Sequence, residues 1–196
     1  MEEKTYKIYD SMYNVIGVAS YEEVHTKGLL HQVVHFWLAG KENDQTWLYI
    51  QKRPEEDPVY QGAYDILTSG HIDPEETHEE AIIHQIQTQL GLSLKKEQLT
   101  HIGHIHQNIM RGTYVDNAVV QIYLYKTDHP EKEFSAAERV LKVKLEDLKK
   151  FIEHQESTLT VYSINNEPFA QTDREQWWPR QGEFEKVVIP YMESHQ

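Results

Sequence analysis

The chain contains no cysteine. This absence excludes disulfide bonds, thiol nucleophiles and cysteine-based zinc sites, and it is typical of proteins kept in a reducing compartment such as the cytoplasm. Long apolar runs are also missing, and the longest are far too short to cross a bilayer. The first residues, MEEKTYKIYD, are acidic and do not resemble a signal peptide. We therefore expect a cytoplasmic protein without a membrane partner.

Positive charge is scarce as well. The 196 residues include 19 lysines and arginines against 32 aspartates and glutamates, which gives a formal net charge of −13. A general nucleic-acid binder needs a basic surface, so nucleic acid is not an expected partner. The remaining composition, 39% hydrophobic and 26% charged, is that of a globular domain. Histidine is unusually frequent, with 12 copies, and metal sites built on it are considered below.

Hydrophobic patterning predicts strands mixed with a few helices. Runs rich in β-branched and aromatic residues, or alternating between polar and apolar, predict strands over 6–9, 14–19, 32–39, 47–51, 64–68, 99–108, 118–125 and 140–144. Helices are expected over 21–27, 79–90 and 145–154, the first between a Ser20 cap and a Gly28 stop. Such a mixture is typical of a layered α/β domain, and the length fits one domain with an extension.

The segment 70–92 has the start and stop residues of a helix that follows a loop. Thr77 and Glu80 fit the capping box, in which the two side chains bond to each other's backbone N–H. Gly91 fits the residue just past the helix end. Glu79 and Glu80 in the first turn complement the helix dipole, which favours a structural role for them. Apolar residues recur at helical spacing and are expected to face the core: Ile82, Ile86 and Leu90.

The same segment, GHIDPEETHEEAIIHQIQTQLGL, resembles the signature of the Nudix hydrolases, G-x5-E-x7-R-E-U-x-E-E-x-G-U, where U is a bulky aliphatic residue. The residues on family positions are Gly70, Glu76, Ile86, Gly91 and Leu92. The family's arginine position is His84, and its three metal-binding glutamate positions are Gln85, Thr88 and Gln89. The resemblance implies an α/β/α sandwich with a mixed sheet over residues 1–150, followed by a C-terminal helical extension, 151–196, that packs on it. It also implies Mg²⁺ or Mn²⁺ as the cofactor.

The replaced glutamates have a physical consequence. Residues three and four apart share a helix face, so Gln85, Thr88 and Gln89 form one patch. Two amides and a hydroxyl are neutral, whereas hard divalent cations favour anionic oxygens. The patch can still hydrogen-bond a ligand, but it cannot lower the pKa of a metal-bound water in the usual way. We therefore expect a protein that binds a nucleotide or another organic diphosphate, with hydrolysis of the family type weak or lost.

The resemblance also assigns expected roles to single residues. Glu76 and His84, on or at family positions, are the candidate catalytic residues. Arg53 opens the loop before the box and is implied to hold the diphosphate, because arginine can contact phosphate bidentately. An ion pair with the acids that follow it is the alternative for Arg53. Gln85 and Gln89 are the other candidate ligand-binding residues.

Further motifs resemble one Nudix branch that is related to isopentenyl-diphosphate isomerases. In order, they are E-V-H at 23–25, H-F-W-L at 35–38, L-Y-I-Q-K-R at 48–53 and S-G-H-I at 69–72. In the isomerase-like relatives a metal is bound by histidines near the positions of His25, His31 and His71. The acidic ligands of those relatives fall near Asp116 and Ala118, so one acid is missing here. Ordinary packing and hydrogen bonding is the alternative role of the three histidines.

Rival functions remain open on the sequence. One is an active hydrolase of a nucleoside diphosphate derivative, whose metal ligands have moved to Glu76, Glu79 and His71. Isomerase-like chemistry is disfavoured by the missing cysteine and by Ala118. A third rival is a regulatory or protein-binding module that forms a homodimer through the Trp177-Trp178 pair of the tail. A separate histidine group fits either a solvated strand edge or a Zn²⁺ or Ni²⁺ site: His101, His104 and His106.

Overall fold

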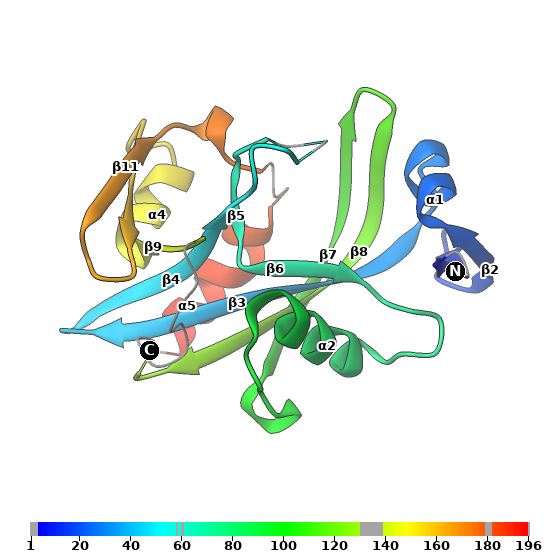
Figure 1. The fold of residues 1–196 in the computed structure, drawn as a ribbon, viewed down its shortest axis with the longest axis horizontal. Helices are drawn as coiled ribbons and strands as arrows, with labels where there is room; N and C mark the ends of the chain where they lie inside the picture. The colour runs from blue at the N-terminus through cyan, green and yellow to red at the C-terminus, as the bar shows by residue number, and fades with distance from the viewer. Residues whose placement is uncertain (1–3, 58, 60, 130–138, 179–181, 196) are drawn as a thin grey trace.

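The computed structural model describes residues 4–57, 59, 61–129, 139–178 and 182–195. Its centre is a sheet of nine strands, whose main path runs in the order β11-β10-β9-β4-β3-β8-β7, while β5 pairs with β4 and β6 with β3 (Figure 1). Strands β3 and β8 run parallel and the other pairs antiparallel, so the sheet is mixed. The strands are β3 His31–Glu42, β4 Gln45–Lys52, β5 Tyr64–Ile66, β6 Thr68–His71, β7 Thr100–Arg111, β8 Tyr114–Thr127, β9 Val140–Lys144, β10 Leu159–Ser163 and β11 Pro168–Thr172.

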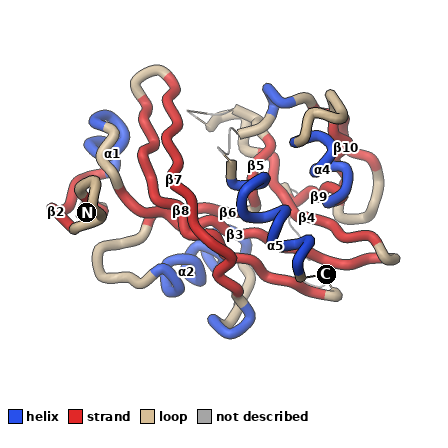
Figure 2. Tube along the Cα trace, turned by 180° about the vertical axis from the view of Figure 1, so that it is seen from behind, coloured by secondary structure: helices blue, strands red, loops and turns tan. Residues whose placement is uncertain are grey.

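Helices cover both faces of this sheet. Helix α2, His78–Leu90, packs on one face, and α4, Leu145–Ile152, packs with α5, Ile189–Ser194, on the other (Figure 1 and Figure 2). Successive side chains of a strand point to opposite faces, and β3 serves both cores: Phe36 packs with α2, whereas Trp37 packs with α4 and α5. The predicted α/β/α sandwich with a mixed sheet is confirmed. Among the described residues, no helix is both long enough and apolar enough to span a membrane.

A small unit at the N-terminus positions the first of the cluster histidines. Strand β1, Thr5–Tyr9, pairs antiparallel with β2, Val15–Ser20, and α1 spans Tyr21–Lys27. Ser20 accepts a hydrogen bond from the Glu23 N–H at the start of α1, and Gly28 ends the helix in the left-handed conformation with φ of 62°. Both ends are therefore fixed, and His25 has a defined, buried place on the side of α1 that faces β8.

Helix α2 has the predicted caps and begins one residue earlier than predicted. The Thr77 side chain accepts a hydrogen bond from the Glu80 N–H at 3.2 Å, and Glu80 Oε2 accepts one from the Thr77 N–H at 2.8 Å. Gly91 follows the helix with φ of 70°. Ala81, Ile82 and Ile86 are buried against β3 and β6. A single 3-10 turn, Lys96–Gln98, then leads into β7.

Replacing Thr77 with alanine removes this cap from an exposed position. We expect the free energy of unfolding to fall by about 1 kcal/mol, the usual cost of losing an N-cap side chain. Thr88 provides a matched control, because its hydroxyl bonds only to carbonyls within its own helix, those of His84 and Gln85, and alanine is the better helix former. Urea denaturation should show Thr77→Ala destabilised and Thr88→Ala unchanged or slightly more stable; equal losses would contradict the role of the cap.

The C-terminal segment adds strands as well as helices. Strand β10 pairs with β9 and with β11, which extends the main sheet at one edge. The sequence pattern does not predict these two strands. A 3-10 turn, Arg174–Gln176, and a π-helical turn, Phe184–Val188, lead into α5. Residues of the π-helical turn and of α5 pack in the core on the face that α4 covers. The segment thus packs on the sheet, while its division from the rest at residue 150 stays a prediction.

A buried ion pair ties these C-terminal strands to the centre. Lys142 on β9 is fully buried, and its Nζ donates to Glu42 Oε1 at 2.7 Å and to Oε2 at 2.9 Å. The ammonium lies 4.6 Å from the centre of the Trp47 ring. The same carboxylate accepts hydrogen bonds from the Tyr49 hydroxyl and from Asn166 in the turn between β10 and β11. One charged group thus joins β3, β4, β9 and that turn.

Candidate metal centre and ligand cleft

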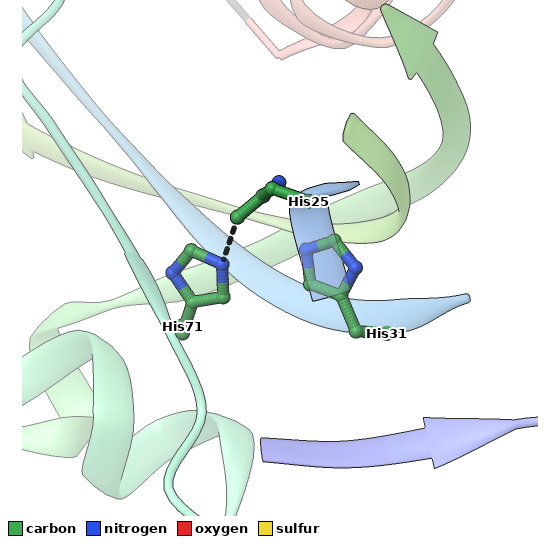
Figure 3. A group of neighbouring side chains, drawn as sticks. All are labelled: His25, His31 and His71. Atoms are coloured by element: carbon green, nitrogen blue, oxygen red, sulfur yellow. Dashed lines mark hydrogen bonds between the residues drawn. The ribbon is translucent and has the colours of Figure 1, made fainter. Parts of the chain in front are cut away.

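Three histidines from distant parts of the chain converge at the edge of the sheet. His25 comes from α1, His31 from the start of β3, and His71 from the end of β6 (Figure 3). Each offers a ring nitrogen, and these atoms all lie within 4.8 Å of one another. The pairing of β3 with β6, which sets Val33 opposite His71, brings the last two together. Among the described residues this is the group that has the geometry to hold a metal ion.

Backbone carbonyls fix the orientation of two of the rings. His25 Nδ1 lies 3.1 Å from the Val115 carbonyl oxygen, and His31 Nδ1 lies 3.0 Å from that of Leu29. A carbonyl only accepts, so Nδ1 carries a proton in both rings, and in a neutral ring Nε2 then keeps its lone pair. His25 Nε2 in turn lies 3.0 Å from His71 Nε2. This arrangement, with one ring nitrogen bonded to the backbone and the other free to ligate, is usual for metal-binding histidines.

Asp116 on β8 completes the centre. Its Oδ2 accepts a hydrogen bond from Gln107 at 2.7 Å, while Oδ1 lies 3.4 Å from His31 Nε2. Neither Oδ1 nor that Nε2 makes a hydrogen bond, although both atoms are buried. Buried polar atoms without a hydrogen-bond partner are unfavourable, and a divalent cation between these two would satisfy both. The residues present therefore fit a metal ion at this point.

The protonation states suit a metal as well. Burial, followed by the neighbouring His31 and His25, lowers the pKa of His71 to about 3. Burial and His31 also lower the pKa of His25. Burial alone would raise the pKa of Asp116, but its contact with His31 and the bond from Gln107 hold it at about 2. At neutral pH His25 and His71 are therefore neutral and Asp116 is ionised, and these are the forms that bind metals.

A cleft of about 340 Å³ opens beside this centre. Its lining joins the metal centre to an arginine and to aromatic side chains: His71, Asp116, Arg53, Asp57, Tyr114 and Trp178. The Arg53 guanidinium lies 4.1 Å from the Trp178 ring centre and is ion-paired with Asp65 and Asp57. Burial would lower the pKa of Arg53, but the two carboxylates raise it. The ion pair with Asp57, which was the alternative for Arg53, is present. Arg53 also lines the cleft, and its contact with a diphosphate stays a prediction.

The neutral patch of α2 is turned toward β6 and does not form a cation site. Gln89 Nε2 donates to Gln85 Oε1 at 2.7 Å and to the Ser69 carbonyl at 3.1 Å, and Gln89 Oε1 accepts from the Thr68 hydroxyl. Gly70 admits this packing, because a Cβ there would lie 2.2 Å from Gln85 Cδ. The amides act as a clamp between helix and strand. No carboxylate belongs to the patch, so these residues do not fit a divalent cation.

The acidic residues near the start of α2 lie apart from the histidine centre. His84 Nδ1 is 3.2 Å from Glu76 Oε1, and Glu76 Oε2 accepts a bond from the Asp73 N–H, so these two predicted catalytic residues bond to each other and to the loop. Glu76 and Glu79 border a separate pocket of about 280 Å³. Neither belongs to the metal-ligating group that contains His71. The structure therefore does not bring together the relocated ligand set of Glu76, Glu79 and His71.

The remaining candidates occupy other positions. His101, His104 and His106 are exposed on β7, the outer strand of the main path, and His101 and His106 bond to side chains of β8. In the tail, Trp178 is 7% exposed and lines the cleft, and Trp177 packs against the core, so the pair is not an exposed contact surface. The contribution of Trp178 to the cleft is missed by the sequence reasoning, because no local pattern links it to Arg53.

Comparison with known proteins supports the fold and the family. No family model matches the chain. The chain is 29% identical over 160 residues to an uncharacterized Nudix hydrolase of Clostridium acetobutylicum, covering 79% of this chain and 77% of that protein. It is 26% identical over 155 residues to Nudix hydrolase 3 of Arabidopsis thaliana, covering 74% of this chain and only 20% of that protein. The solved structure of DR0079 from Deinococcus radiodurans has a TM-score of 0.55 at 14% identity, covering 78% of this chain and 91% of that one, which is a likeness of fold.

The named relatives are Nudix hydrolases, and the described sheet, helices and box segment have the arrangement that the family resemblance implies. Sequence and fold therefore lead to the same conclusion: the chain belongs to the Nudix superfamily.

Proposed function

We propose that this protein binds a nucleotide or another organic diphosphate in the cleft through a divalent metal held by His25, His31 and His71 with Asp116, and that family-type hydrolysis at the box helix is weak or lost. The observation that carries the proposal is a pair of buried atoms, His31 Nε2 and Asp116 Oδ1, which lie 3.4 Å apart and make no hydrogen bond. They lie beside a cleft that also contains Arg53.

Charge in the cleft makes the metal necessary for binding an anion. Apart from the imidazoles, Asp57, Asp65 and Asp116 contribute three negative charges against the single positive charge of Arg53. The surroundings of a diphosphate are therefore net negative by two. One divalent cation brings this sum to zero, and the bound metal supplies positive charge directly to phosphate oxygens. Binding of the diphosphate should consequently depend on the metal.

The donor set also favours one kind of metal. Imidazole nitrogens suit Zn²⁺ and its neighbours among the transition metals, whereas Mg²⁺ prefers oxygen ligands. Three imidazoles and one carboxylate therefore favour Zn²⁺ over the Mg²⁺ or Mn²⁺ that the family resemblance implies. The family resemblance implies a divalent metal, and the proposed site keeps that requirement while placing the ion away from the box.

The box helix supports the second part of the proposal. Its three family glutamate positions hold Gln85, Thr88 and Gln89, and the two amides are occupied in the clamp to β6. Hard cations bind weakly to neutral oxygens that are already hydrogen-bonded. Activation of water by Mg²⁺ at that face is therefore not supported by the side chains present.

The proposal is tested with the Zn²⁺-loaded protein and methylenediphosphonate, a diphosphate analogue that is not hydrolysed. Calorimetry should detect binding to the loaded protein and a loss of at least about tenfold in affinity after treatment with EDTA, because removal of the cation leaves a net negative cleft. In parallel, nucleoside diphosphate derivatives with Mg²⁺ should be hydrolysed no faster than in the blank. Metal-independent binding, or Mg²⁺-dependent turnover at ordinary enzyme rates, would refute the proposal.

A second candidate function is hydrolysis from the histidine centre itself. This candidate requires that Asp116 leave the fourth ligand position to water. It is favoured by one observation, that three histidines beside an open cleft match the ligand number of catalytic zinc sites. Zn²⁺-dependent turnover that survives removal of Mg²⁺ and disappears in His31→Gln would favour this candidate over binding alone.

A further inference from the structure

Arg53 is held by two carboxylates that differ in their surroundings. Asp65 has a side chain that is 1% exposed, and its Oδ2 accepts from Arg53 Nε at 3.0 Å while Oδ1 accepts from the Ile66 N–H. Asp57 has a side chain that is 14% exposed and lines the cleft, and its Oδ2 accepts from Arg53 Nη1 at 2.6 Å. One partner is thus part of the protein interior, and the other stands where a ligand would enter.

The guanidinium keeps its orientation without Asp57. The buried Asp65 holds the Nε edge, and the Trp178 ring lies against one face at 4.1 Å. The backbone of Trp178 is itself held in place, because its backbone N–H donates to the Tyr64 carbonyl at 2.9 Å. Planar arginine held in this way is preorganised for an anion in its plane. The Asp57 carboxylate already occupies one such position, at the Nη1 end.

We propose that Asp57 is a specificity-determining residue of the cleft: its carboxylate stands in for the ligand on Arg53 and yields that position to a diphosphate but not to a singly charged anion. The inference rests on the proposed function, because it assumes that a diphosphate enters this cleft. A carboxylate ligand would exchange one single charge for another and gain nothing. A diphosphate carries more charge, can reach the metal centre at the same time, and so outcompetes Asp57.

The loop geometry allows this exchange. Asp57 Oδ1 accepts a hydrogen bond from the Val59 N–H at 3.0 Å, so the side chain belongs to a local turn of the loop that follows β4. Its other oxygen makes the bond to Arg53. A small rotation of the side chain would release Nη1 while the bond to Val59 is kept. The asparagine of Asp57→Asn can also accept from Val59, so this variant removes charge without removing the turn.

The test compares Asp57→Asn with the wild type, both loaded with Zn²⁺ and freed of excess metal. Calorimetry with methylenediphosphonate at low salt should show affinity about tenfold higher in the variant, because a like charge next to the ligand is gone. Acetate at millimolar concentration should compete with the diphosphonate in the variant and not in the wild type. Glu55→Gln is the matched control, since Glu55 lies in the same loop, is exposed, and pairs with Lys52 and not with Arg53.

The outcomes separate the inference from the proposed function. If the wild type binds the diphosphonate and Asp57→Asn shows neither the gain in affinity nor competition by acetate, the inference is wrong and the proposed function stands. Equal gains in Asp57→Asn and Glu55→Gln would reduce the effect to general charge and would also overturn it. If neither the wild type nor Asp57→Asn binds the diphosphonate, the proposed function and the inference both fail.

Discussion

Zinc binding should fall by more than about 100-fold when His71 is replaced by alanine, because even the loss of a group that only supports a metal ligand costs 10–100-fold. His71 lies at the centre of the cluster, 3.0 Å from His25 Nε2, and stacks parallel to the His31 ring at 5.0 Å between ring centres. Its low pKa of about 3 means that the imidazole is neutral at pH 7, with a lone pair available for the metal. Calorimetric titration with Zn²⁺ measures the effect.

Stability provides a second measure of the same prediction. A ligand at about 1,000 times its Kd stabilises the folded state by about 4 kcal/mol, which for a chain of this size corresponds to a rise in Tm of roughly 10 °C. The wild type should show this rise with Zn²⁺, and His71→Ala should not. His104→Ala is the control, because His104 is exposed on β7 and lies outside the cluster. A zinc response that His71→Ala retains in full would contradict the metal centre.

Replacing Glu42 with alanine should cost about 3–5 kcal/mol of folding free energy, because it leaves the buried Lys142 ammonium without a counter-ion. Lys142 is fully buried, and both oxygens of Glu42 accept bonds from its Nζ. The Tyr49 hydroxyl and Asn166 lose their acceptor as well. Urea denaturation should show the loss directly, and the Tm should fall by about 2–4 °C for each kcal/mol.

Two comparisons test the cause of this loss. The double variant Glu42→Ala with Lys142→Met removes both charges, so it should lose less stability than Glu42→Ala alone.

Burial would raise the pKa of Glu42, but its bonds to Lys142, Tyr49 and Asn166 leave it below the ordinary 4.5. The ionised carboxylate therefore stabilises the fold above about pH 4.5, and this contribution is lost as the pH falls through the lower folded-state pKa. If the free energy of unfolding of Glu42→Ala stays within about 0.5 kcal/mol of the wild-type value, the ion pair does not stabilise the fold.

Local sequence patterns predict most of the secondary structure correctly. The ends of α1 and α2 depend on Ser20, Gly28, Thr77 and Gly91, each of which acts on backbone groups within a few residues of itself. Most strands before residue 145 follow from alternation and β-branched content, which are also local. The single strand predicted over 64–68 is wrong, because the chain there forms β5, which pairs with β4, and then β6, which pairs with β3. Strands β10 and β11 are missed. The run Leu159–Ser163 does alternate, but Pro168–Thr172 offers little pattern, and its pairing with β10 supplies what the pattern lacks.

The site is harder to predict from the sequence than the secondary structure, because the register of the sheet brings its residues together. His31 lies opposite Ala118 on β8, which brings Asp116 near it, and Val33 lies opposite His71 on β6. A shift of one residue in either pairing would turn these side chains to the other face of the sheet. The sequence could therefore name the three histidines only through resemblance, and it favoured ordinary packing and hydrogen bonding for them.

By itself the sequence determined the box segment, the caps of its helix, the neutral character of the helix face and the absence of thiol chemistry, since these follow from residue type and short spacing. Only the tertiary structure decided that the two amides of that face clamp α2 to β6, that Asp116 joins His25, His31 and His71, and that Trp178 supports Arg53. The physical reason is that hydrogen bonds, ion pairs and metal ligands act over a few ångströms. These residues lie far apart in the sequence, and only the pairing of strands brings them that close.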